Sequence, residues 1–295
     1  MKAAIDIGSN TVQLLAGTVC DGQIKPQLQL LQTTRLGFSP FPNLLDPKRI
    51  GDTLSVLTDY QRQLDSIGVH DVSLIATSAV RDAQNRDLLI DSVRDKLGWQ
   101  IRVLNGRDEA IYSYRGVSLL RQKGVPILVL DIGGGSTELI WSDEPKQIKA
   151  QSINVGAVRV HLKGWSEGKI EDIVEQQLKK ARLPIPASKK MQVIGVGGTV
   201  TTAAAVLKNL QIYSRDEVHG TKLDDKNILD LRNKLAALSV ADRYAYSPLL
   251  KQRGDIIVDG LTILIVIMRA LGISELIASG AGILDGVLLT AYAQV

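Results

Sequence analysis

The sequence has one cysteine and few aromatic side chains, and both shortages narrow the class of protein. Cys20 is the single cysteine among 295 residues, which excludes an internal disulfide and a cysteine-based metal cluster. Phe, Trp and Tyr make up 4% of the chain, so base stacking on exposed rings is not the expected main activity. His70, His161 and His219 lie far apart in sequence and show no metal-ligand spacing.

Long apolar runs and a strong net charge are also missing. The longest apolar stretch, residues 261–268, is too short to cross a bilayer. The chain leads from Met1 and Lys2 directly into a strand pattern, so we expect no signal peptide, no membrane partner and a soluble cytoplasmic protein. A net charge of +4 is too small to indicate a nucleic-acid partner, although it suits an acidic ligand if the positive charge is local.

The most informative stretch follows a short apolar run at residues 125–130. Asp131 ends that run, glycines follow at 133–135, and Glu138 comes three residues later. Glycines let the chain turn tightly and expose amide N–H groups, so the loop can surround a phosphate. Two carboxylates beside a phosphate repel it unless a divalent cation lies between them, which predicts Mg²⁺ or another hard divalent cation. The alternative is a hairpin whose glycines serve only the turn.

A second copy of this pattern, at residues 3–15, favours the phosphate interpretation. Asp6 aligns with Asp131, and Gln13 aligns with Glu138. Because 295 residues with 45% hydrophobic content can form two cores, the repeat predicts two similar domains. Facing loops would then form a cleft for a phosphorylated ligand. Gln13 lacks a charge, so we expect one metal site, nearer the second domain.

The order of strand and helix patterns predicts an α/β fold in both domains. We expect an N-terminal domain at 1–120 and a C-terminal domain at 121–295, with a last helix at about 282–295 that can pack back on the first domain. In the first domain the pattern predicts a third strand at 28–34 and a helix from 106 to about 120.

Five ordered motifs support a family resemblance that covers almost the whole chain. It resembles the exopolyphosphatase / guanosine pentaphosphate phosphohydrolase (Ppx/GppA) family of the actin-like ATPase superfamily. The resemblance implies duplicated ribonuclease-H-like domains with the active-site cleft between them, and a short form without the C-terminal helical domains of longer members. The motifs lie at residues 4–11, 76–85, 106–117, 131–138 and 197–199, with a further match at 218–220.

The resemblance assigns chemical roles to four side chains. Glu109 would be the catalytic base that activates water, since an in-line water needs a carboxylate to orient it and take its proton. Arg81 would hold the terminal phosphate with its planar fork of donors. Asp131 and Glu138 would hold the metal. The alternatives are a helix-start carboxylate for Glu109, a solvated side chain for Arg81, a turn cap for Asp131 and a surface strand residue for Glu138.

Backbone amides and hydroxyls of the glycine-rich turns are expected to donate to phosphates. For the loop at 197–199, close packing of a helix on a strand is an alternative, and both can hold. Asp6 is equally compatible with a water-mediated metal contact and with a structural turn. The expected phosphate-binding residues besides Arg81 are Ser9, Asn10, Gly133, Gly134, Gly135, Ser136, Gly197, Gly198 and Thr199.

Two positions depart from the family pattern. Leu284-Asp285 stand where the family tends to have Arg-Glu, so a phosphate contact is in doubt. Arg253-Gly254-Asp255 stand where the family has arginine-alanine-aspartate.

These observations predict a metal-dependent phosphohydrolase that releases the terminal phosphate of inorganic polyphosphate or guanosine pentaphosphate. The alternatives are a non-hydrolytic sensor that binds guanosine tetraphosphate or pentaphosphate, and a small-molecule kinase of the same superfamily. The sequence chooses neither the substrate nor the oligomeric state, although an isologous homodimer would be unsurprising.

Overall fold

The computed structural model describes residues 1–41, 43–143, 147–181 and 191–293. The chain divides into two compact units, and each is treated by itself. Unit 1 consists of residues 1–119 and 283–295, and unit 2 consists of residues 120–282.

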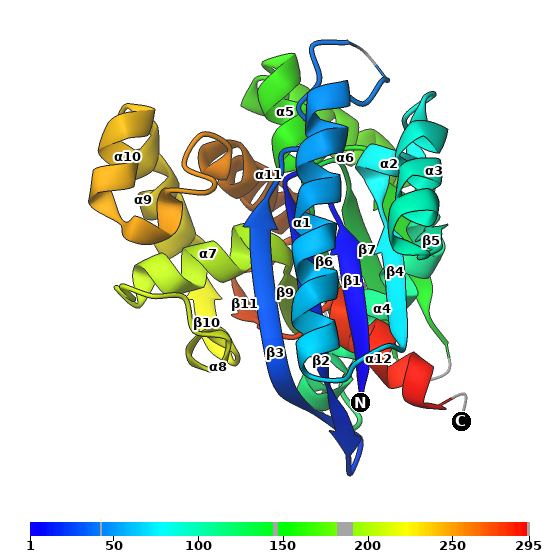
Figure 1. Cartoon of the computed structure of the whole chain (residues 1–295). Coiled ribbons are helices and arrows are strands. Elements are labelled where there is room, and N and C mark those ends of the chain that lie inside the picture. Colours follow the sequence, from blue (N-terminus) through cyan, green and yellow to red (C-terminus); the bar gives the residue numbers. More distant parts are fainter. Residues whose placement is uncertain (42, 144–146, 182–190, 294–295) are drawn as a thin grey trace. The chain divides into compact units, whose positions relative to one another are not determined.

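Unit 1 is built on a mixed sheet with the strand order β3-β2-β1-β4-β5 (Figure 1). The first three strands form an antiparallel meander, whereas β4 and β5 run parallel to β1. The strands are β1 (Lys2–Ile7), β2 (Thr11–Cys20), β3 (Gln23–Thr33), β4 (Val72–Ala76) and β5 (Ile101–Val103).

Helices cover both faces of the sheet of unit 1. Alternate residues of β1 point to opposite faces, so Ile5 and Ile7 pack with α1 and α3, whereas Ala4 packs with α4 and α12. Asp6 falls on the same face as Ala4. The helices are α1 (Pro47–Ser66), α2 (Ser78–Arg81), α3 (Arg86–Leu97), α4 (Gly106–Gly116) and α12 (Ile283–Ala293).

The last helix of the chain, α12, packs against α4 and β1 within unit 1. Gly286 makes the close approach possible, since a Cβ there would lie 1.9 Å from the backbone oxygen of Tyr112. Two polar contacts hold its C-terminal end: Lys2 Nζ donates to the Ala291 oxygen (3.0 Å) and the Tyr292 hydroxyl to the Gly17 oxygen (2.9 Å).

Unit 2 repeats this plan on a sheet with the order β10-β11-β9-β6-β7-β8. Its antiparallel meander β6-β7-β8 corresponds to β1-β2-β3, and β9 lies parallel to β6 as β4 lies parallel to β1. The strands are β6 (Ile127–Ile132), β7 (Thr137–Ser142), β8 (Lys149–Ile153), β9 (Gln192–Val196), β10 (Thr221–Asp224) and β11 (Glu275–Ala278).

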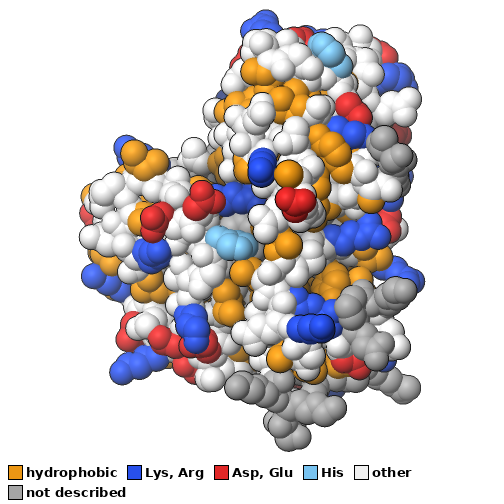
Figure 2. Space-filling view, turned by 90° about the horizontal axis from the view of Figure 1, so that it is seen from below, with side chains coloured by type: hydrophobic (Ala, Val, Ile, Leu, Met, Phe, Trp, Pro, Cys, Tyr) orange, Lys and Arg blue, Asp and Glu red, His pale blue; other side chains and the backbone are white. Residues whose placement is uncertain are grey.

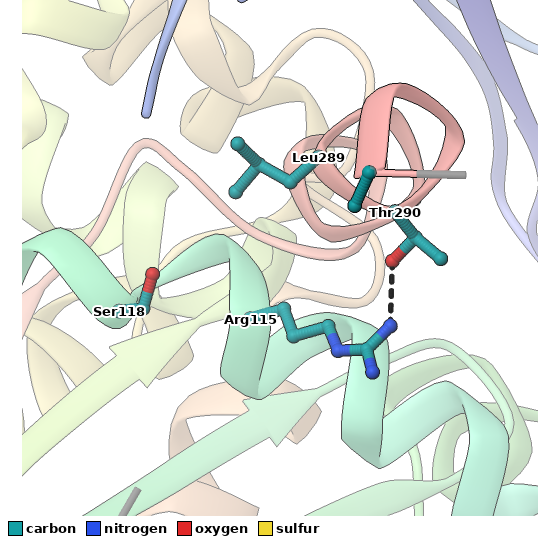
Figure 3. Close-up of a pocket in the computed structure, with 5 residues that line it drawn as sticks. Arg115, Ser118, Leu289 and Thr290 are labelled. Atoms are coloured by element: carbon teal, nitrogen blue, oxygen red, sulfur yellow. Dashed lines mark hydrogen bonds between the residues drawn. The ribbon is translucent and has the colours of Figure 1, made fainter. Parts of the chain in front are cut away.

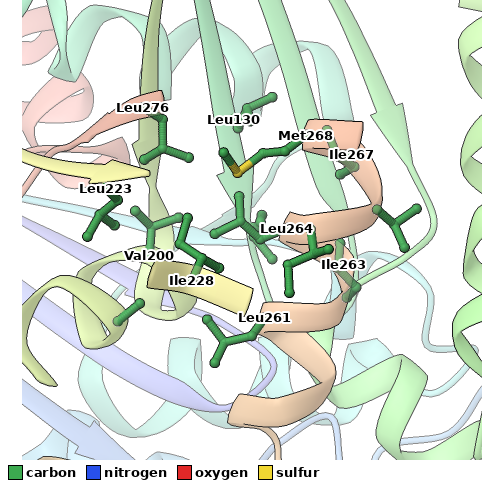
Figure 4. Close-up of a cluster of buried hydrophobic side chains, with 14 of the residues drawn as sticks. Leu130, Val200, Leu223, Ile228, Leu261, Ile263, Leu264, Ile267, Met268 and Leu276 are labelled. Carbon is green, nitrogen blue, oxygen red and sulfur yellow. The ribbon is translucent and has the colours of Figure 1, made fainter. Parts of the chain in front are cut away.

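The core of unit 2 forms around α11 (Ile257–Leu271), which is apolar nearly all round (Figure 4). Leu261 and Leu264 pack with Leu130 of β6 and Val200 of α7. The remaining helices are α5 (Ala157–Lys163), α6 (Glu167–Ala181), α7 (Gly197–Leu207), α8 (Arg215–Val218), α9 (Asp225–Ala236) and α10 (Val240–Tyr246), with short 3₁₀ turns η1 (Ser118–Leu120) and η2 (Pro248–Leu250).

Two predicted boundaries were wrong. The third strand begins at Gln23 rather than at residue 28, because Asp21 and Gly22 both have positive φ (52° and 72°) and form a tight hairpin turn that pairs Cys20 with Gln23 at once. Helix α4 ends at Gly116 and is followed by the separate turn η1. Among the described residues, none of the helices has both the length and the apolar character required to cross a membrane.

Candidate active site

The turn after β1 has its carbonyl oxygens held from one side. The Asn10 oxygen accepts from the amides of Thr34 (3.1 Å) and Arg35 (2.9 Å), and the Ser9 oxygen accepts from the amide of Gly37 (2.7 Å). In a trans peptide the N–H points away from the C=O of the same plane, so the Asn10 N–H points away from residues 34–37. The Asn10 amide is therefore directed away from its supporting loop, and its phosphate role stays a prediction.

Hydroxyl groups gather beside this turn. The Oγ atoms of Ser9 and Ser78 lie 3.1 Å apart, and both side chains are buried. Ser78 begins α2, directly after β4, where ligands of open α/β sheets lie. Sequence reasoning did not select Ser78; its place at the carboxyl end of a strand parallel to β1 was the available signal.

A largely buried ion pair in unit 1 joins the two residues for which the resemblance implied catalytic and phosphate-holding roles. Arg81 Nη1 donates to Glu109 Oε2 (2.8 Å) and to the backbone oxygen of Leu104 (3.0 Å). Glu109 is only 7% exposed, and a carboxylate so deeply buried requires a partner. Arg81 Nη2 has no hydrogen bond to the described part of the chain, so that end of the guanidinium can take an anion.

The capping role at the start of α4 belongs to other residues. The Asn105 side chain accepts the amide of Asp108 (2.9 Å), and the Asp108 carboxylate contacts Arg102 (3.2 Å). Since Asn105 provides the side-chain cap at this helix start, capping does not explain the buried carboxylate of Glu109.

The triple-glycine turn of unit 2 repeats the geometry of the first turn, with α5 in the place of residues 34–37. The Gly133 and Gly134 oxygens accept from the amides of Ala157 (3.0 Å) and Val158 (2.8 Å), and Arg159 Nε donates to the Gly135 oxygen (2.7 Å). The amides in the same peptide planes, those of Gly134, Gly135 and Ser136, therefore point away from α5.

The two predicted metal-binding carboxylates lie directly opposite each other on neighbouring strands. Asp131 pairs with Glu138 across β6 and β7, so their side chains share one face of the sheet. Glu138 is 1% exposed and its Oε1 accepts from Ser152 Oγ (2.7 Å). Asp6 and Gln13 occupy the same register positions in unit 1.

A third glycine turn opens α7 beside Asp131. Gly197 has φ +84°, and a Cβ on it would lie 2.9 Å from Asp131 Oδ1 and 2.6 Å from the Ile132 oxygen. A Cβ on Gly198 would lie 1.9 Å from Arg253 Nη1. The close approach of Gly197 to β6 agrees with the helix–strand packing alternative, whereas the close neighbour of Gly198 is a side chain. The phosphate role of Gly197, Gly198 and Thr199 stays a prediction.

Arg253 is a candidate site residue that sequence reasoning noted but did not select. Its guanidinium lies at the first turn of α7, where the helix dipole also favours an anion. Burial lowers the pKa of the Arg253 guanidinium, and Tyr213 and Asp255 oppose that shift. Burial makes a cation less favourable, and a bound anion such as phosphate would stabilise the Arg253 cation at this helix N-terminus.

Leu284 and Asp285, at the departure from the family pattern, are both buried at the start of α12. Leu284 packs in an apolar cluster with Tyr112 and Leu104, so its side chain supplies no phosphate contact. A pocket of about 520 Å³ near the end of α12 contains none of the predicted site residues (Figure 3). It is lined by Arg115, Ser118, Leu289, Thr290 and Ala293.

The structure thus brings together two sets of predicted residues. In unit 1 they are Ser9 and Asn10 on one turn, and Arg81 with Glu109. In unit 2 they are Asp131 and Glu138 beside the glycine turns. That the two sets act on one ligand is a prediction from the sequence. Charged side chains of both signs are interspersed on the face shown in Figure 2.

Two α/β units that repeat one sheet plan, with a carboxylate at the same strand position, define a protein of the actin-like fold. A family model described as the Ppx/GppA phosphatase family matches residues 20–294, and the chain belongs to that family. The predicted fold class is confirmed by solved structures, including a Ppx/GppA family member from Aquifex aeolicus (26% identity, TM-score 0.81, covering 99% of this chain and 97% of that one).

Named relatives extend along the whole chain. Exopolyphosphatase 2 of Mycobacterium tuberculosis is 30% identical over 311 residues, which covers 98% of this chain and 97% of the relative. The guanosine-5'-triphosphate,3'-diphosphate pyrophosphatase of Pseudoalteromonas atlantica is 27% identical over 299 residues, covering 98% of this chain and 58% of the relative.

Proposed function

We propose that the protein is a metal-dependent phosphohydrolase that releases the terminal phosphate of inorganic polyphosphate or guanosine pentaphosphate. The observation that carries this proposal is the buried contact between Arg81 and Glu109, 2.8 Å long. This contact joins the Arg81 guanidinium, which can bind an anion, to the Glu109 carboxylate, which does not cap its helix. The names of the two relatives, one acting on polyphosphate and one on guanosine-5'-triphosphate,3'-diphosphate, support the substrate class.

The terminal phosphoryl group is held by donors from unit 1 in this proposal. Arg81 supplies its Nη2 group, and the turn at Ser9 and Asn10 supplies the Asn10 amide, which points away from its supporting loop, and the Ser9 hydroxyl. These donors stabilise the charge that spreads over the phosphoryl oxygens as the bond to the leaving group breaks.

Glu109 orients the attacking water and takes its proton. Its Oε2 is tied to Arg81, which fixes the carboxylate beside the phosphate that Arg81 holds. A water on Glu109 would then meet the terminal phosphorus from the side opposite the leaving group, as in-line displacement requires. The guanidinium and the carboxylate therefore act as one unit.

The residues of unit 2 fit a bound Mg²⁺. Asp131 and Glu138 present hard carboxylate oxygens on one face, and the described residues hold no cluster of three or more His, Cys, Asp or Glu side chains able to bind a metal. Mg²⁺ suits such a sparse set because it keeps several waters and takes further oxygens from substrate phosphates. When bound, the ion would neutralise phosphate charge beside these carboxylates. Arg253 and the first turn of α7 would hold a further phosphate of the chain.

A phosphate-release assay tests the proposal. Polyphosphate, guanosine pentaphosphate and ATP are supplied in turn, with Mg²⁺ and with a chelator. We expect release from one of the first two that depends on the divalent cation. Binding of guanosine tetraphosphate without any release would indicate the sensor instead, and consumption of ATP only with an added acceptor would indicate a kinase.

A further inference from the structure

Arg253 lies in a turn between η2 and α11, and its backbone hydrogen bonds hold it there. The Arg253 amide donates to the Leu250 oxygen (3.1 Å), and the Arg253 oxygen accepts from the amides of Ile256 (3.0 Å) and Ile257 (2.9 Å). The backbone of Arg253 is therefore fixed between η2 and α11. The next residue, Gly254, has no side chain with which to anchor the turn further.

Arg243 of α10 supplies that anchor. Its Nη1 donates to the Gly254 oxygen (2.8 Å), and its Nε donates to the Leu235 oxygen (2.7 Å). Leu235 lies in the last turn of α9, where a cation is favourable, and its oxygen also accepts from the amide of Leu238 (3.2 Å). One guanidinium thus joins the end of α9 to the residue that follows Arg253.

The ring of Tyr244 packs against the same turn, on the side where Gly254 lacks a side chain. A Cβ on Gly254 would lie 2.8 Å from Tyr244 Cε1 and 2.9 Å from the Leu250 oxygen. The aromatic ring therefore occupies the space in which an alanine at 254 would place its methyl group. The glycine and the ring form a matched pair, because the glycine alone would leave the turn free to move.

We propose that Arg243 and Tyr244 are positioning residues for Arg253. They lock the turn at Gly254, so that the guanidinium of Arg253 stays against Gly198 at the first turn of α7. This inference rests on the proposed function, in which Arg253 and α7 hold a phosphate of the substrate.

The neighbouring start of α11 supports the assignment. Asp259, in the first turn of α11, has its Oδ2 at hydrogen-bond distance from His161 Nδ1 (3.1 Å), and the charge of Arg243 also acts on its carboxylate. Arg243 therefore acts on both sides of the turn, through a hydrogen bond at Gly254 and through charge at Asp259. A neutral amide side chain could donate the hydrogen bond but could not supply the charge.

The test is a double-mutant cycle with inorganic phosphate as the competitive inhibitor. Arg253→Met should raise the KM and the phosphate inhibition constant about 10-fold or more, since a hydrogen bond to a charged group is lost. Arg243→Met should also raise the KM and the phosphate inhibition constant, and the change in kcat should be smaller than the change in KM. The double variant should be no worse than Arg253→Met alone, because both changes remove one interaction.

Two further variants separate positioning from loss of fold. Arg243→Lys keeps a cation and one donor, so it should recover part of the phosphate affinity. Gly254→Ala disturbs the turn without touching Arg243 and should also weaken phosphate inhibition. Arg232→Met is the matched control: it removes an ion pair with Glu167 (3.2 Å) in the same unit and should leave the inhibition constant unchanged.

Each result points to a different failure. If Arg253→Met leaves phosphate inhibition unchanged, the phosphate role of Arg253 in the proposed function is wrong. If Arg253→Met weakens inhibition but the effect of Arg243→Met adds to it in full, Arg243 does not act through Arg253 and the inference is overturned. Unchanged inhibition in both Arg243→Met and Gly254→Ala overturns it as well.

Discussion

At the scale of single residues, two neighbouring carboxylates, Asp108 and Glu109, differ in their surroundings. Asp108 and Glu109 are neighbours in the first turn of α4, and both suit a helix N-terminus by charge. Asp108 meets the cap residue Asn105 and solvent, whereas Glu109 is buried against Arg81. The half-buried neighbour therefore provides an internal control for the buried one.

We expect Glu109→Gln to keep the shape and the contact with Arg81 while removing the proton acceptor. Turnover should fall by about 10²-fold or more, with a smaller change in KM, because general base catalysis contributes about this much. Asp108→Asn is the matched control and should retain most of the turnover. Phosphate release from Glu109→Gln at the wild-type rate would show that Glu109 is not the base.

Asp259 gives a prediction on pH dependence. Burial raises the pKa of its carboxyl above the ordinary value of about 3.9, while His161 and Arg243 oppose the shift and Asp255 adds to it. The folded state therefore binds more protons than the unfolded state between the two pKa values. Its contribution to stability is full below the unfolded pKa and is lost as the pH rises through the folded pKa.

The measurement is the free energy of unfolding in urea between about pH 4 and pH 7, compared with Asp259→Asn. The stability of the wild type relative to the variant should increase as the pH falls. Asp172→Asn, at an exposed position on α6, is the control and should show no such trend. A difference that grows with rising pH would contradict the assignment.

At the scale of elements, α5 is the support of the triple-glycine turn. The first amides of α5 donate to the Gly133 and Gly134 oxygens. Gly156 allows α5 to lie this close to the turn, because a Cβ there would lie 2.5 Å from the Gly134 backbone. A change that shifts the start of α5 is therefore expected to shift the triple-glycine turn as well.

Gly156→Ala should lower the free energy of unfolding by about 1–3 kcal/mol, because the clash is with backbone and forces a shift. The KM should rise as well, since the amides of the turn are displaced. Gly168→Ala is the control: nothing lies within 4 Å of that Cβ, and alanine should stabilise α6 by about 0.5–1 kcal/mol. Thermal unfolding and KM measurements check both variants.

The sequence was sufficient for the repeat and for most elements, because apolar periodicity and glycine turns are local signals. It missed β10, which has only four residues and pairs with β11 as an edge of the sheet. It also did not select Ser78 and Arg253 as candidate site residues. Their proximity to Ser9 and Gly198 depends on contacts between segments far apart in the chain, which one sequence without an alignment does not reveal.

At the scale of the whole molecule, the duplication is the feature that makes the metal proposal testable. Both units place a carboxylate at the end of their first strand, Asp6 and Asp131, opposite a residue of the second strand. The two units differ at that second position, where unit 1 has Gln13 and unit 2 has Glu138. Glutamine and glutamate have nearly the same shape, so exchanging them at these two positions changes the charge and little else.

We expect Glu138→Gln, which makes unit 2 resemble unit 1, to raise the Mg²⁺ concentration for half-maximal phosphate release at least about 10-fold. The change removes one hard anionic ligand and keeps an acceptor for Ser152. Gln13→Glu is the reciprocal control and should leave the Mg²⁺ requirement unchanged, because the proposed metal site lies in unit 2. A changed Mg²⁺ requirement in Gln13→Glu would contradict a cation effect specific to the Glu138 position, and no shift in Glu138→Gln would remove Glu138 from the metal site.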